Sequence, residues 1–291
     1  MPPQISLPEG GASYALASAL LPEARAVVSP ASAARNTRRR APISATILTH
    51  NSAAHLGEVL TALQWCNEVV VLDTGSADET ALIAGDFVNV RFHRMSGPFP
   101  GFGLAHRQAV AIARNDWILS VDSDEVVSDG LAAEIMGLRL DPHTIYAIPF
   151  RNFFKGTLIT TCGWSPDRHE RLFNRTSANF CESVVHERVR APGASVRRLR
   201  QPILHYSYGS LDDFLRKMRD YGTLYAKQHA GRKSSGPFKA LTRGAWAFAK
   251  SYLLRRGILQ GSAGFAISAY QAQLVFWKYM LLDEANRGLG A

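Results

Sequence analysis

The chain has 291 residues, 46% hydrophobic and 20% charged, which are ordinary proportions for a globular protein with a sizeable core, in one large domain or one domain with an appendage. Its three cysteines are unclustered and form no Cys-x-x-Cys, so neither a disulfide framework nor a zinc site is indicated, and a reducing cytosol fits best. The net charge is +9, and +8 of it lies from His205 onward, where thirteen Lys and Arg stand against five Asp and Glu; this suggests a polyanionic partner such as anionic lipid, a phosphorylated glycolipid or nucleic acid.

The first forty residues show no sustained periodicity. They are rich in Ala, Ser and Pro and end in Arg38-Arg39-Arg40, so we expect residues 1–40 to be a disordered extension or the product of a misassigned start. The mildly apolar Tyr14–Leu21 precedes the first basic residue, Arg25, which is the reverse of the order in a signal peptide. No stretch of the sequence reaches the roughly 18 uninterrupted apolar residues that predict a membrane span.

Strands alternating with helices are predicted from Ile43 onward. The apolar runs predict strands at 43–49, 68–73, 88–92 and 117–121. Helical spacing is found between them, around 56–63, from 74–78 through about 85, and within 101–114. Such alternation predicts βαβ units in a mostly parallel sheet with helices over both faces, which explains the nearly continuous apolar runs.

The pattern changes in the second half of the chain. A helix at 129–140 and a strand at 145–154 are expected first. Residues 155–204 are dense in Arg, His, Trp and Gly with weak periodicity, and a long irregular segment of this kind is often functional. Amphipathic, aromatic and basic helices are expected from Leu211 to about 283.

Acidic side chains follow two of the predicted strands. Asp122 and Asp124 come directly after the run 117–121, and Asp73 ends the run 68–73. The ends of parallel strands meet at one rim, where open α/β sheets bind ligands, and the loop Thr49-His50-Asn51 ends there too. Oxygen ligands on a short loop suit Mg²⁺ or Mn²⁺ holding a diphosphate, although Asp and Ser after a strand are also typical of a plain turn or helix cap.

This outline is that of a nucleotide pocket. Arg107, on the helix before the fourth strand, is positioned to supply a cation for phosphate. The sequence contains no Gly-x-Gly-x-x-Gly and no Walker A loop, which argues against a dinucleotide-binding or P-loop fold.

Several motifs together resemble the family 2 glycosyltransferases of the GT-A fold. They are Thr49-His50-Asn51, Val70–Asp78, Gly101-Phe102-Gly103 and Asp122–Glu125. Further motifs are similar to bacterial lipopolysaccharide core β-1,4-glucosyltransferases: Gly163–Asp167, Arg171–Phe173, Val185–Val189 and His205–Tyr208. Ser52 is a departure, because a Glu often follows the Asn in this family. The resemblance covers about residues 43–285 and implies a GT-A catalytic domain at 41–210 with a helical, basic region at 211–291.

The resemblance implies an inverting transfer of a sugar, expected to be glucose, from a UDP-sugar to a lipid-linked lipopolysaccharide core acceptor. By position, Thr49, Asn51 and Asp73 would hold the nucleoside, and Arg107 would lie near the diphosphate. Asp122 would contact the ribose. Together with Asp124 and His205 it would also bind a divalent cation, either Mg²⁺ or Mn²⁺. His205 is equally compatible with a role as a core histidine.

Inversion in a single displacement requires a general base beside the acceptor hydroxyl. Glu187 is the first candidate because it lies in the family-like Val-His-Glu segment, Asp167 is the second and Glu182 the third. A salt bridge to a neighbouring arginine is the structural alternative for Glu187. Acceptor binding is expected from three side chains, each of which is also compatible with a packing or ion-pairing role: Trp164, Arg171 and Arg188.

The C-terminal region interleaves aromatic and basic residues, which is typical of a helix lying on an anionic leaflet. We therefore expect a cytoplasmic protein, peripheral on the inner face of the cytoplasmic membrane. Two alternatives remain: transfer for exopolysaccharide or a lipid-phosphate-linked sugar, and a non-catalytic basic module. No nucleic-acid-binding motif is recognisable, so no nucleic-acid partner is expected.

Overall fold

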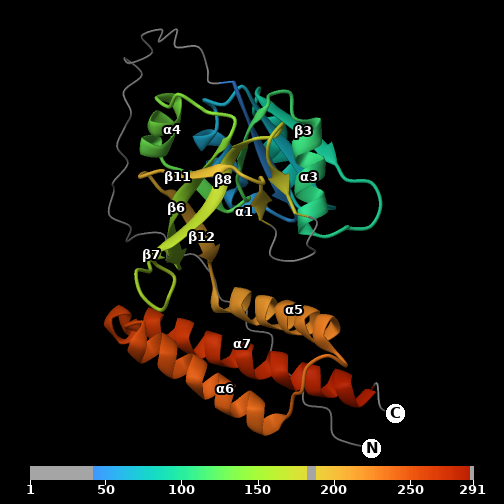
Figure 1. The fold of residues 1–291 in the computed structure, drawn as a ribbon, viewed down its shortest axis with the longest axis vertical. Helices are drawn as coiled ribbons and strands as arrows, with labels where there is room; N and C mark the ends of the chain where they lie inside the picture. The colour runs from blue at the N-terminus through green and yellow to red at the C-terminus, as the bar shows by residue number, and fades with distance from the viewer. Residues whose placement is uncertain (1–41, 182–187, 289–291) are drawn as a thin grey trace, which may run out of the picture. The chain divides into compact units, whose positions relative to one another are not determined.

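The computed structural model describes residues 42–181 and 188–288. The predicted N-terminal extension therefore lies outside the described residues. The chain builds one large mixed sheet with helices over it, followed by three long helices (Figure 1).

The first half of the sheet is parallel, in the order β3-β2-β1-β4. Its strands are β1 (Ile43–Thr49), β2 (Glu68–Asp73), β3 (Val90–Arg94) and β4 (Trp117–Ser120). Thr49 lies opposite Asp73 in the register, so the carboxyl ends of β1 and β2 reach the same edge. This is the predicted arrangement, and it places the candidate loops side by side.

The second half of the sheet is mixed, in the order β4-β8-β6-β12-β5. Its strands are β5 (Glu125–Val127), β6 (Thr144–Phe154), β8 (Asp167–Asn174) and β12 (Ile203–Tyr208). The short strands β7 (Thr157–Leu158) and β11 (Ser195–Arg198) pair with β6, while β9 (Asn179–Phe180) and β10 (Val189–Arg190) pair with each other.

The sheet must curl in its second half. In a flat sheet, four strand steps of about 4.8 Å would place β5 roughly 19 Å from β4. The linker of residues 121–124 includes a turn and reaches less than about 18 Å even when extended. The curl therefore brings β12 and β6 towards the loop that carries Asp122 and Asp124.

Helices cover both faces of the parallel strands. They are α1 (Ala53–Ala62), α2 (Thr80–Gly85), α3 (Phe102–Ile112) and α4 (Asp129–Met136). Val69 and Val71 of β2 pack in a core cluster with Leu56 and Leu60 of α1, whereas Val70 packs with Val110 of α3 in a second cluster. Both faces of the strand are buried, which accounts for its unbroken apolar run.

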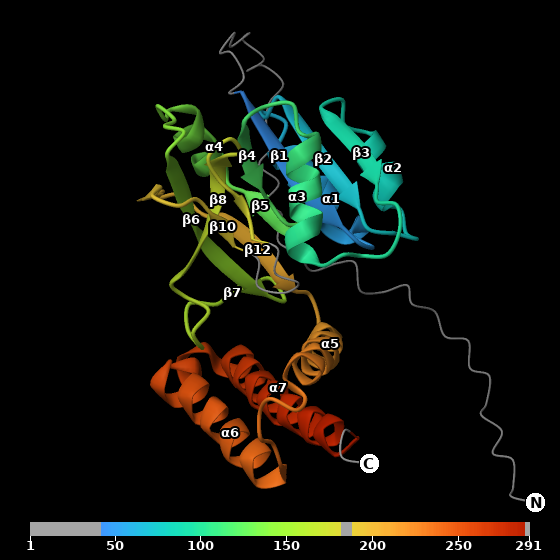
Figure 2. The same cartoon turned by 45° about the vertical axis from the view of Figure 1, so that its right-hand side comes forward.

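Three helices follow the sheet (Figure 2). They are α5 (Leu211–His229), α6 (Pro237–Ala249) and α7 (Gly261–Gly288), with a π-helical turn η2 (Lys250–Leu254) and a 3₁₀ turn η3 (Gly257–Gln260) between the last two. A capping box starts α5: Ser210 Oγ accepts from Asp213 N at 3.2 Å, and Asp213 Oδ2 accepts from Ser210 N at 2.8 Å.

A third apolar cluster joins these helices to the sheet. Phe154 of β6 stacks on Phe214 of α5, with ring centroids 4.9 Å apart, and Phe214 stacks on Tyr270 of α7 at 4.2 Å. Within the described ranges, no helix is both long and apolar enough to cross a bilayer. The predicted α/β fold with a C-terminal helical extension is confirmed.

The main differences from expectation lie in residues 155–204, which contain strands where weak periodicity suggested irregular structure. The key strand is β8, whose first half is charged and largely exposed while Leu172–Asn174 are buried. Only part of the strand faces the core, so the alternation that identifies a strand is too short to detect. Strand β5 was also unexpected, because three residues carry no period.

Candidate active site

Asp73 organises the loop that follows β2. Its carboxylate is fully buried and accepts from Thr49 Oγ1 at 3.1 Å, from the backbone N–H groups of Gly75 and Ser76 at 3.2 and 3.0 Å, and from the Ser76 hydroxyl. Arg94 Nε lies 3.3 Å from Oδ2. Burial alone would raise the pKa of Asp73, but these hydrogen bonds lower it by more, so the group stays ionised. Asp73 thus shapes the rim from beneath it.

Asn51 ties this loop to the one after β1. Its backbone is in the left-handed region, with φ of 51°, which Asn tolerates better than most residues. Its N–H donates to Ser76 Oγ at 2.8 Å, and its Oδ1 accepts from Ala77 N at 2.9 Å. The loops after β1 and β2 therefore form one connected rim, as the strand-end argument predicted.

A buried charge cluster lies beneath the Asp122–Asp124 loop. Arg171 of β8 donates from one guanidinium nitrogen to Asp122 Oδ2 at 2.9 Å and to Glu125 Oε1 at 2.5 Å. Glu125 Oε2 also accepts from the Asp122 N–H at 2.9 Å. The Arg171 side chain is only 12% exposed, so its guanidinium is directed into this cluster. It fixes the conformation of the loop that carries both acids.

The two carboxyls of this cluster have opposite pKa shifts. Burial raises the pKa of Glu125 well above its ordinary value; Arg171 offsets part of this rise, and Asp122 adds to it. Burial also acts to raise the pKa of Asp122, but the charges of Arg171 and His106 outweigh it and lower that pKa. Asp122 therefore carries the negative charge at the pocket wall.

Asp124 and His205 form the next pair along the curled sheet. Asp124 Oδ2 lies 3.7 Å from His205 Nε2, and the Asp124 backbone oxygen accepts from Tyr206 N at 2.9 Å. Burial acts to raise the pKa of Asp124, but the adjacent His205 lowers it by more. The other ring nitrogen of His205, Nδ1, lies 2.8 Å from Asn152 Oδ1 and 3.0 Å from Ser207 Oγ.

Carboxylate oxygens and imidazole nitrogens both serve as ligands of divalent cations. Among the residues that the structure describes, no group of three or more His, Cys, Asp or Glu side chains is arranged to hold a metal ion. Mg²⁺ usually keeps several waters and binds one or two carboxylates together with substrate phosphates. The Asp124–His205 pair would supply one carboxylate and one imidazole to such a cation, and a bound diphosphate and water would have to supply its other ligands.

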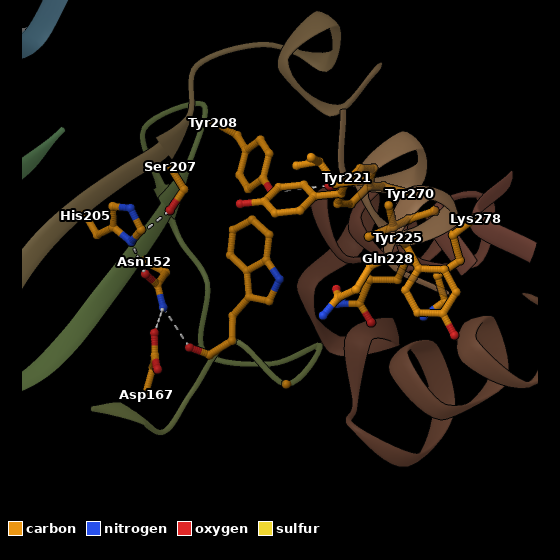
Figure 3. A pocket seen from close by; sticks show the side chains of 15 residues that line it. Asn152, Asp167, His205, Ser207, Tyr208, Tyr221, Tyr225, Gln228, Tyr270 and Lys278 are labelled. Atoms are coloured by element: carbon orange, nitrogen blue, oxygen red, sulfur yellow. Dashed lines mark hydrogen bonds between the residues drawn. The ribbon is translucent and has the colours of Figure 1, made fainter. Parts of the chain in front are cut away.

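Two pockets involve residues around this pair, since His205 lines one of them and Asp122, on the same loop as Asp124, lines the other. The first, which we name the rim pocket, has a cavity volume of about 730 Å³ and is lined by Thr49, Thr74, His106, Asp122 and Lys217, among others. The second, which we name the helix pocket, has a cavity volume of about 570 Å³. It lies between the sheet and helices α5 and α7 and is lined by Trp164, Asp167, His205, Tyr208, Tyr225 and Lys278, among others (Figure 3).

Tyr221 of α5 lines both pockets, so they meet at its side chain. Figure 3 shows Asn152 between His205 and Asp167 on one side of the helix pocket, with the tyrosines of α5 and α7 opposite. The arrangement suits two ligands that approach one reaction centre from different sides. The rim pocket combines polar rim groups with the rings of Phe99 and Phe102, and the helix pocket presents the aromatic faces of Trp164 and several tyrosines.

The structure brings several predicted residues to this centre. Thr49 and Asp122 line the rim pocket, Trp164, Asp167 and His205 line the helix pocket, and Asp124 lies beside His205. Asn51 and Asp73 support the rim through hydrogen bonds.

Other predicted residues lie elsewhere. Arg107 donates to the Phe180 backbone oxygen at 3.4 Å and is not among the lining residues of either pocket. Arg188 lines a separate surface depression that also includes Arg168 and Arg171. Glu182 and Glu187, both candidates for the general base, lie outside the described residues.

Sequence reasoning missed the contribution of α5. Lys217 and Tyr221 are four residues apart on one helical face, and both line the rim pocket. Lys217 Nζ donates to the Ser207 backbone oxygen at 3.2 Å and lies 4.2 Å from the centroid of the Tyr208 ring. The face was visible as a helical stripe, but nothing local indicated that it points to the strand-end acids. Lys217 is a cationic side chain that lines the rim pocket, whereas Arg107 is not among the residues that line that pocket.

Comparisons with known proteins show which sequences and structures this chain is similar to. Residues 44–161 match the family model described as Glycosyl transferase family 2. An uncharacterized glycosyltransferase of Rickettsia felis is 29% identical over 265 residues, which cover 84% of this chain and 90% of the relative. The lipopolysaccharide core biosynthesis glycosyltransferase LpsC of Rhizobium meliloti is 27% identical over 195 residues, covering 64% and 71%. The chain is also similar to the structure of S. aureus TarS in complex with UDP, with a TM-score of 0.41, 14% identity, and coverage of 84% and 91%.

Proposed function

Because this chain is a nucleotide-sugar-dependent glycosyltransferase with a family 2 domain over residues 44–161, we propose that it transfers a hexose from a UDP-sugar to a lipopolysaccharide inner-core acceptor. The observation that carries the proposal is that the rim pocket and the helix pocket share Tyr221. Asp122 lines the first pocket, and His205, which lies 3.7 Å from Asp124, lines the second. The lipopolysaccharide core assignment of LpsC supports the acceptor class, and glucose is the proposed sugar.

The donor occupies the rim pocket in this proposal. The nucleoside lies against Thr49 and the rim that Asn51 and Asp73 hold in place. Asp122 faces the ribose. Lys217 lines the same pocket and offers a positive charge to the diphosphate, a role that Arg107 on α3 would share.

Asp124 and His205 would hold a divalent cation, Mg²⁺ or Mn²⁺, with Asp122 nearby on the same loop. When bound, such a cation neutralises the negative charge that develops on the leaving diphosphate. The protein's own contribution is a carboxylate and an imidazole 3.7 Å apart, of which the imidazole lines the helix pocket. The buried Arg171–Glu125 contact keeps that loop in position.

The acceptor occupies the helix pocket, where aromatic side chains can pack on the apolar faces of a sugar. Trp164 and Tyr208 stack with ring centroids 5.5 Å apart and form one wall. Arg171 and Arg188 remain proposed acceptor contacts for phosphate groups further out, although the Arg171 guanidinium is engaged with Asp122 and Glu125.

Transfer with inversion requires one displacement. The acceptor oxygen forms a bond to the anomeric carbon, the bond from that carbon to the diphosphate oxygen breaks with its electron pair on UDP, and the hydroxyl proton passes to a carboxylate. Glu187 is the first candidate for this base, and Asp167 is the second. The pKa of Asp167 is affected most by burial, which raises it, but its contacts with His169 and Asn152 produce a net lowering, and this makes Asp167 a weaker proton acceptor.

Turnover of Glu187→Gln and Asp167→Asn distinguishes the two candidates. The variant that lacks the true base should lose at least about 100-fold in kcat, which is the lower end of what general base catalysis usually contributes. It should still bind the donor. Near-normal kcat in Glu187→Gln with intact donor binding would remove Glu187 from this role.

Peripheral attachment to the inner face of the cytoplasmic membrane is also part of the proposal. The corner between α6 and α7 exposes Leu253, Leu254, Ile258 and Leu259 by 53–73%, next to Arg255 and Arg256. Apolar side chains that insert beside basic ones suit an anionic bilayer, where a lipid-linked acceptor is found.

Thermal unfolding with a panel of nucleotide sugars tests the function. One UDP-sugar with Mn²⁺ or Mg²⁺ should raise Tm, because a ligand that binds only the folded state stabilises it. Asp124→Ala should lose both this protection and transfer, whereas the control Asp116→Ala, whose side chain is 58% exposed and paired with Arg175, should keep both. Full activity of Asp124→Ala, or protection by no nucleotide sugar, contradicts the proposal.

The acceptor class is tested by mass spectrometry of lipopolysaccharide from a strain that lacks this protein. A core shortened by one hexose supports the assignment. If the core is intact and exopolysaccharide is lost, the acceptor belongs to exopolysaccharide synthesis and the lipopolysaccharide assignment is wrong.

A further inference from the structure

The side chain of Asn152 cannot rotate freely between its two amide orientations. Its Nδ2 donates to the Trp164 backbone oxygen at 2.9 Å and to Asp167 Oδ2 at 3.0 Å. Both partners accept only, since one is a carbonyl and the other a carboxylate, so the amide nitrogen must lie on that side. The side chain is on β6 and only 6% exposed, which makes the loss of these bonds costly.

The fixed amide determines the tautomer of His205. Asn152 Oδ1 lies 2.8 Å from His205 Nδ1, and because an amide oxygen only accepts, Nδ1 must carry the hydrogen. In the neutral ring, Nε2 then presents a lone pair, and it faces Asp124 Oδ2 at 3.7 Å. The Ser207 hydroxyl, 3.0 Å from Nδ1, can donate or accept and does not select a tautomer by itself.

When the ring is neutral, the two acceptor atoms Nε2 and Asp124 Oδ2 face each other, and a positive charge between them, either an added proton on Nε2 or a metal cation, relieves their repulsion. The separation of 3.7 Å is too long for a hydrogen bond. Two ligands that each lie about 2.1 Å from one cation are roughly 3 Å or more apart, so a shared divalent ion fits this spacing.

We propose that Asn152 is a positioning residue that holds His205 in the Nδ1–H tautomer, so that Nε2 and Asp124 together receive a divalent cation. The inference rests on the metal-assisted transfer proposed above and goes beyond it by assigning a role to Asn152, which lines the helix pocket and acts on the cation only through His205. Strand register supports it, since Asn152 lies directly opposite His205 on the neighbouring strands β6 and β12, and Asp167 is on β8, the other neighbour of β6.

Removing this support should weaken cation binding. Titration calorimetry of Mn²⁺ into the full chain with bound UDP measures the effect without relying on turnover. Asn152→Ala should bind Mn²⁺ about 10- to 100-fold more weakly, the usual loss when the partner of a metal-bound histidine is removed. The control Ser207→Ala removes the other Nδ1 contact and should bind almost as the wild type does.

The tautomer can be read directly in the wild-type protein, which removes any dependence on the folding of a variant. Long-range ¹⁵N–¹H spectra of histidine-labelled, cation-free protein at about pH 8.5, two units above the ordinary histidine pKa, should show His205 as Nδ1–H. His205→Gln identifies its signals. An Nε2–H ring in the wild type, or wild-type Mn²⁺ affinity in Asn152→Ala, overturns the inference.

The two proposals fail in different ways. If Asp124→Ala loses Mn²⁺ and Asn152→Ala does not, only the positioning role is wrong. If the wild-type protein binds UDP but no divalent cation, the metal-assisted part of the proposed function is wrong and the positioning role is overturned with it.

Discussion

Arg171 shows how a single cation can stabilise a loop that carries reactive groups. It lies on β8 and reaches Asp122 and Glu125, which are far away in the sequence, while its guanidinium carbon lies 5.5 Å from the centre of the Phe150 ring. Glu125 is 1% exposed, so without Arg171 it would have to take up a proton or remain as a buried, uncompensated charge.

Arg171→Met should therefore destabilise the fold. We expect a loss of about 3 kcal/mol in the free energy of unfolding, near the lower end for removing one partner of a buried ion pair, because Glu125 can protonate. Urea denaturation measures it. Arg216→Met on the exposed face of α5 breaks surface ion pairs and is the control, expected to change stability little. Equal effects of the two substitutions would contradict the structural role of Arg171.

His106 should give the stability a dependence on acid pH. Burial lowers its pKa to about 4, an effect opposed by Asp122 and increased by Arg171. Between about pH 6.5, where an unfolded histidine titrates, and about 4, the unfolded chain binds a proton that the folded chain does not. The contribution of His106 to the free energy of unfolding is therefore complete above this pH window. It falls as the pH drops through the window, by at most about 1.4 kcal/mol per pH unit.

The comparison variant for this prediction is His106→Gln. Its unfolding free energy, followed by urea denaturation across the same pH window, should decline less steeply than that of the wild type. Parallel pH profiles for the two proteins would show that His106 is not the titrating group.

At the scale of elements, the C-terminal helices pack closely because small residues lie where they cross. Gly244 of α6 faces the Ala272 backbone oxygen of α7, which would lie 3.1 Å from an added Cβ. At the corner before α7 the approach is tighter, since a Cβ on Gly264 would lie 1.9 Å from the Gly257 oxygen. The corner can close only if position 264 has no side chain.

Gly264→Ala should consequently strain the corner between η3 and α7. We expect a loss of about 1–3 kcal/mol, typical of overpacking, despite the better helix propensity of alanine. Gly85→Ala at the end of α2 is the matched control, because nothing lies within 4 Å of its added Cβ. Chemical denaturation of both proteins checks the expectation, and an unchanged Gly264→Ala would mean that the corner has more room.

At the scale of the whole molecule, charge and apolar exposure coincide in the C-terminal region. Net charge from His205 onward is +8, and the corner residues Leu254 and Leu259 are 67% and 73% exposed. Electrostatic attraction to an anionic surface and burial of apolar side chains would then act together. Salt should weaken the electrostatic attraction but not the burial of the apolar side chains.

Cosedimentation with vesicles tests this surface. The protein should bind phosphatidylglycerol-containing vesicles at low salt and neutral phosphatidylcholine vesicles far less. Leu254→Glu with Leu259→Glu should reduce binding strongly, whereas Leu82→Glu on α2, at a side chain that is 69% exposed, should not. Indifference of the wild-type protein to anionic vesicles at low salt would rule out the membrane role.

The residues that local patterns identify are those at strand ends. The predicted strands 43–49 and 68–73 have the bounds observed for β1 and β2, and the strand predicted at 117–121 ends one residue later than β4. Strands that are buried on both faces form apolar runs, which can be recognised in the sequence without knowing their partners. Asp73, Asp122 and Asp124 follow from the same local reasoning.

Only the tertiary structure decided what surrounds those acids. Arg171 meets Asp122 because antiparallel β8 enters between β4 and β6, and Asn152 meets His205 through the register of β6 and β12. Lys217 and Tyr221 reach the rim because α5 packs back towards it. These contacts join segments 49 or more residues apart, and strand register and helix docking, which set such contacts, depend on packing across the molecule rather than on the period of any one segment.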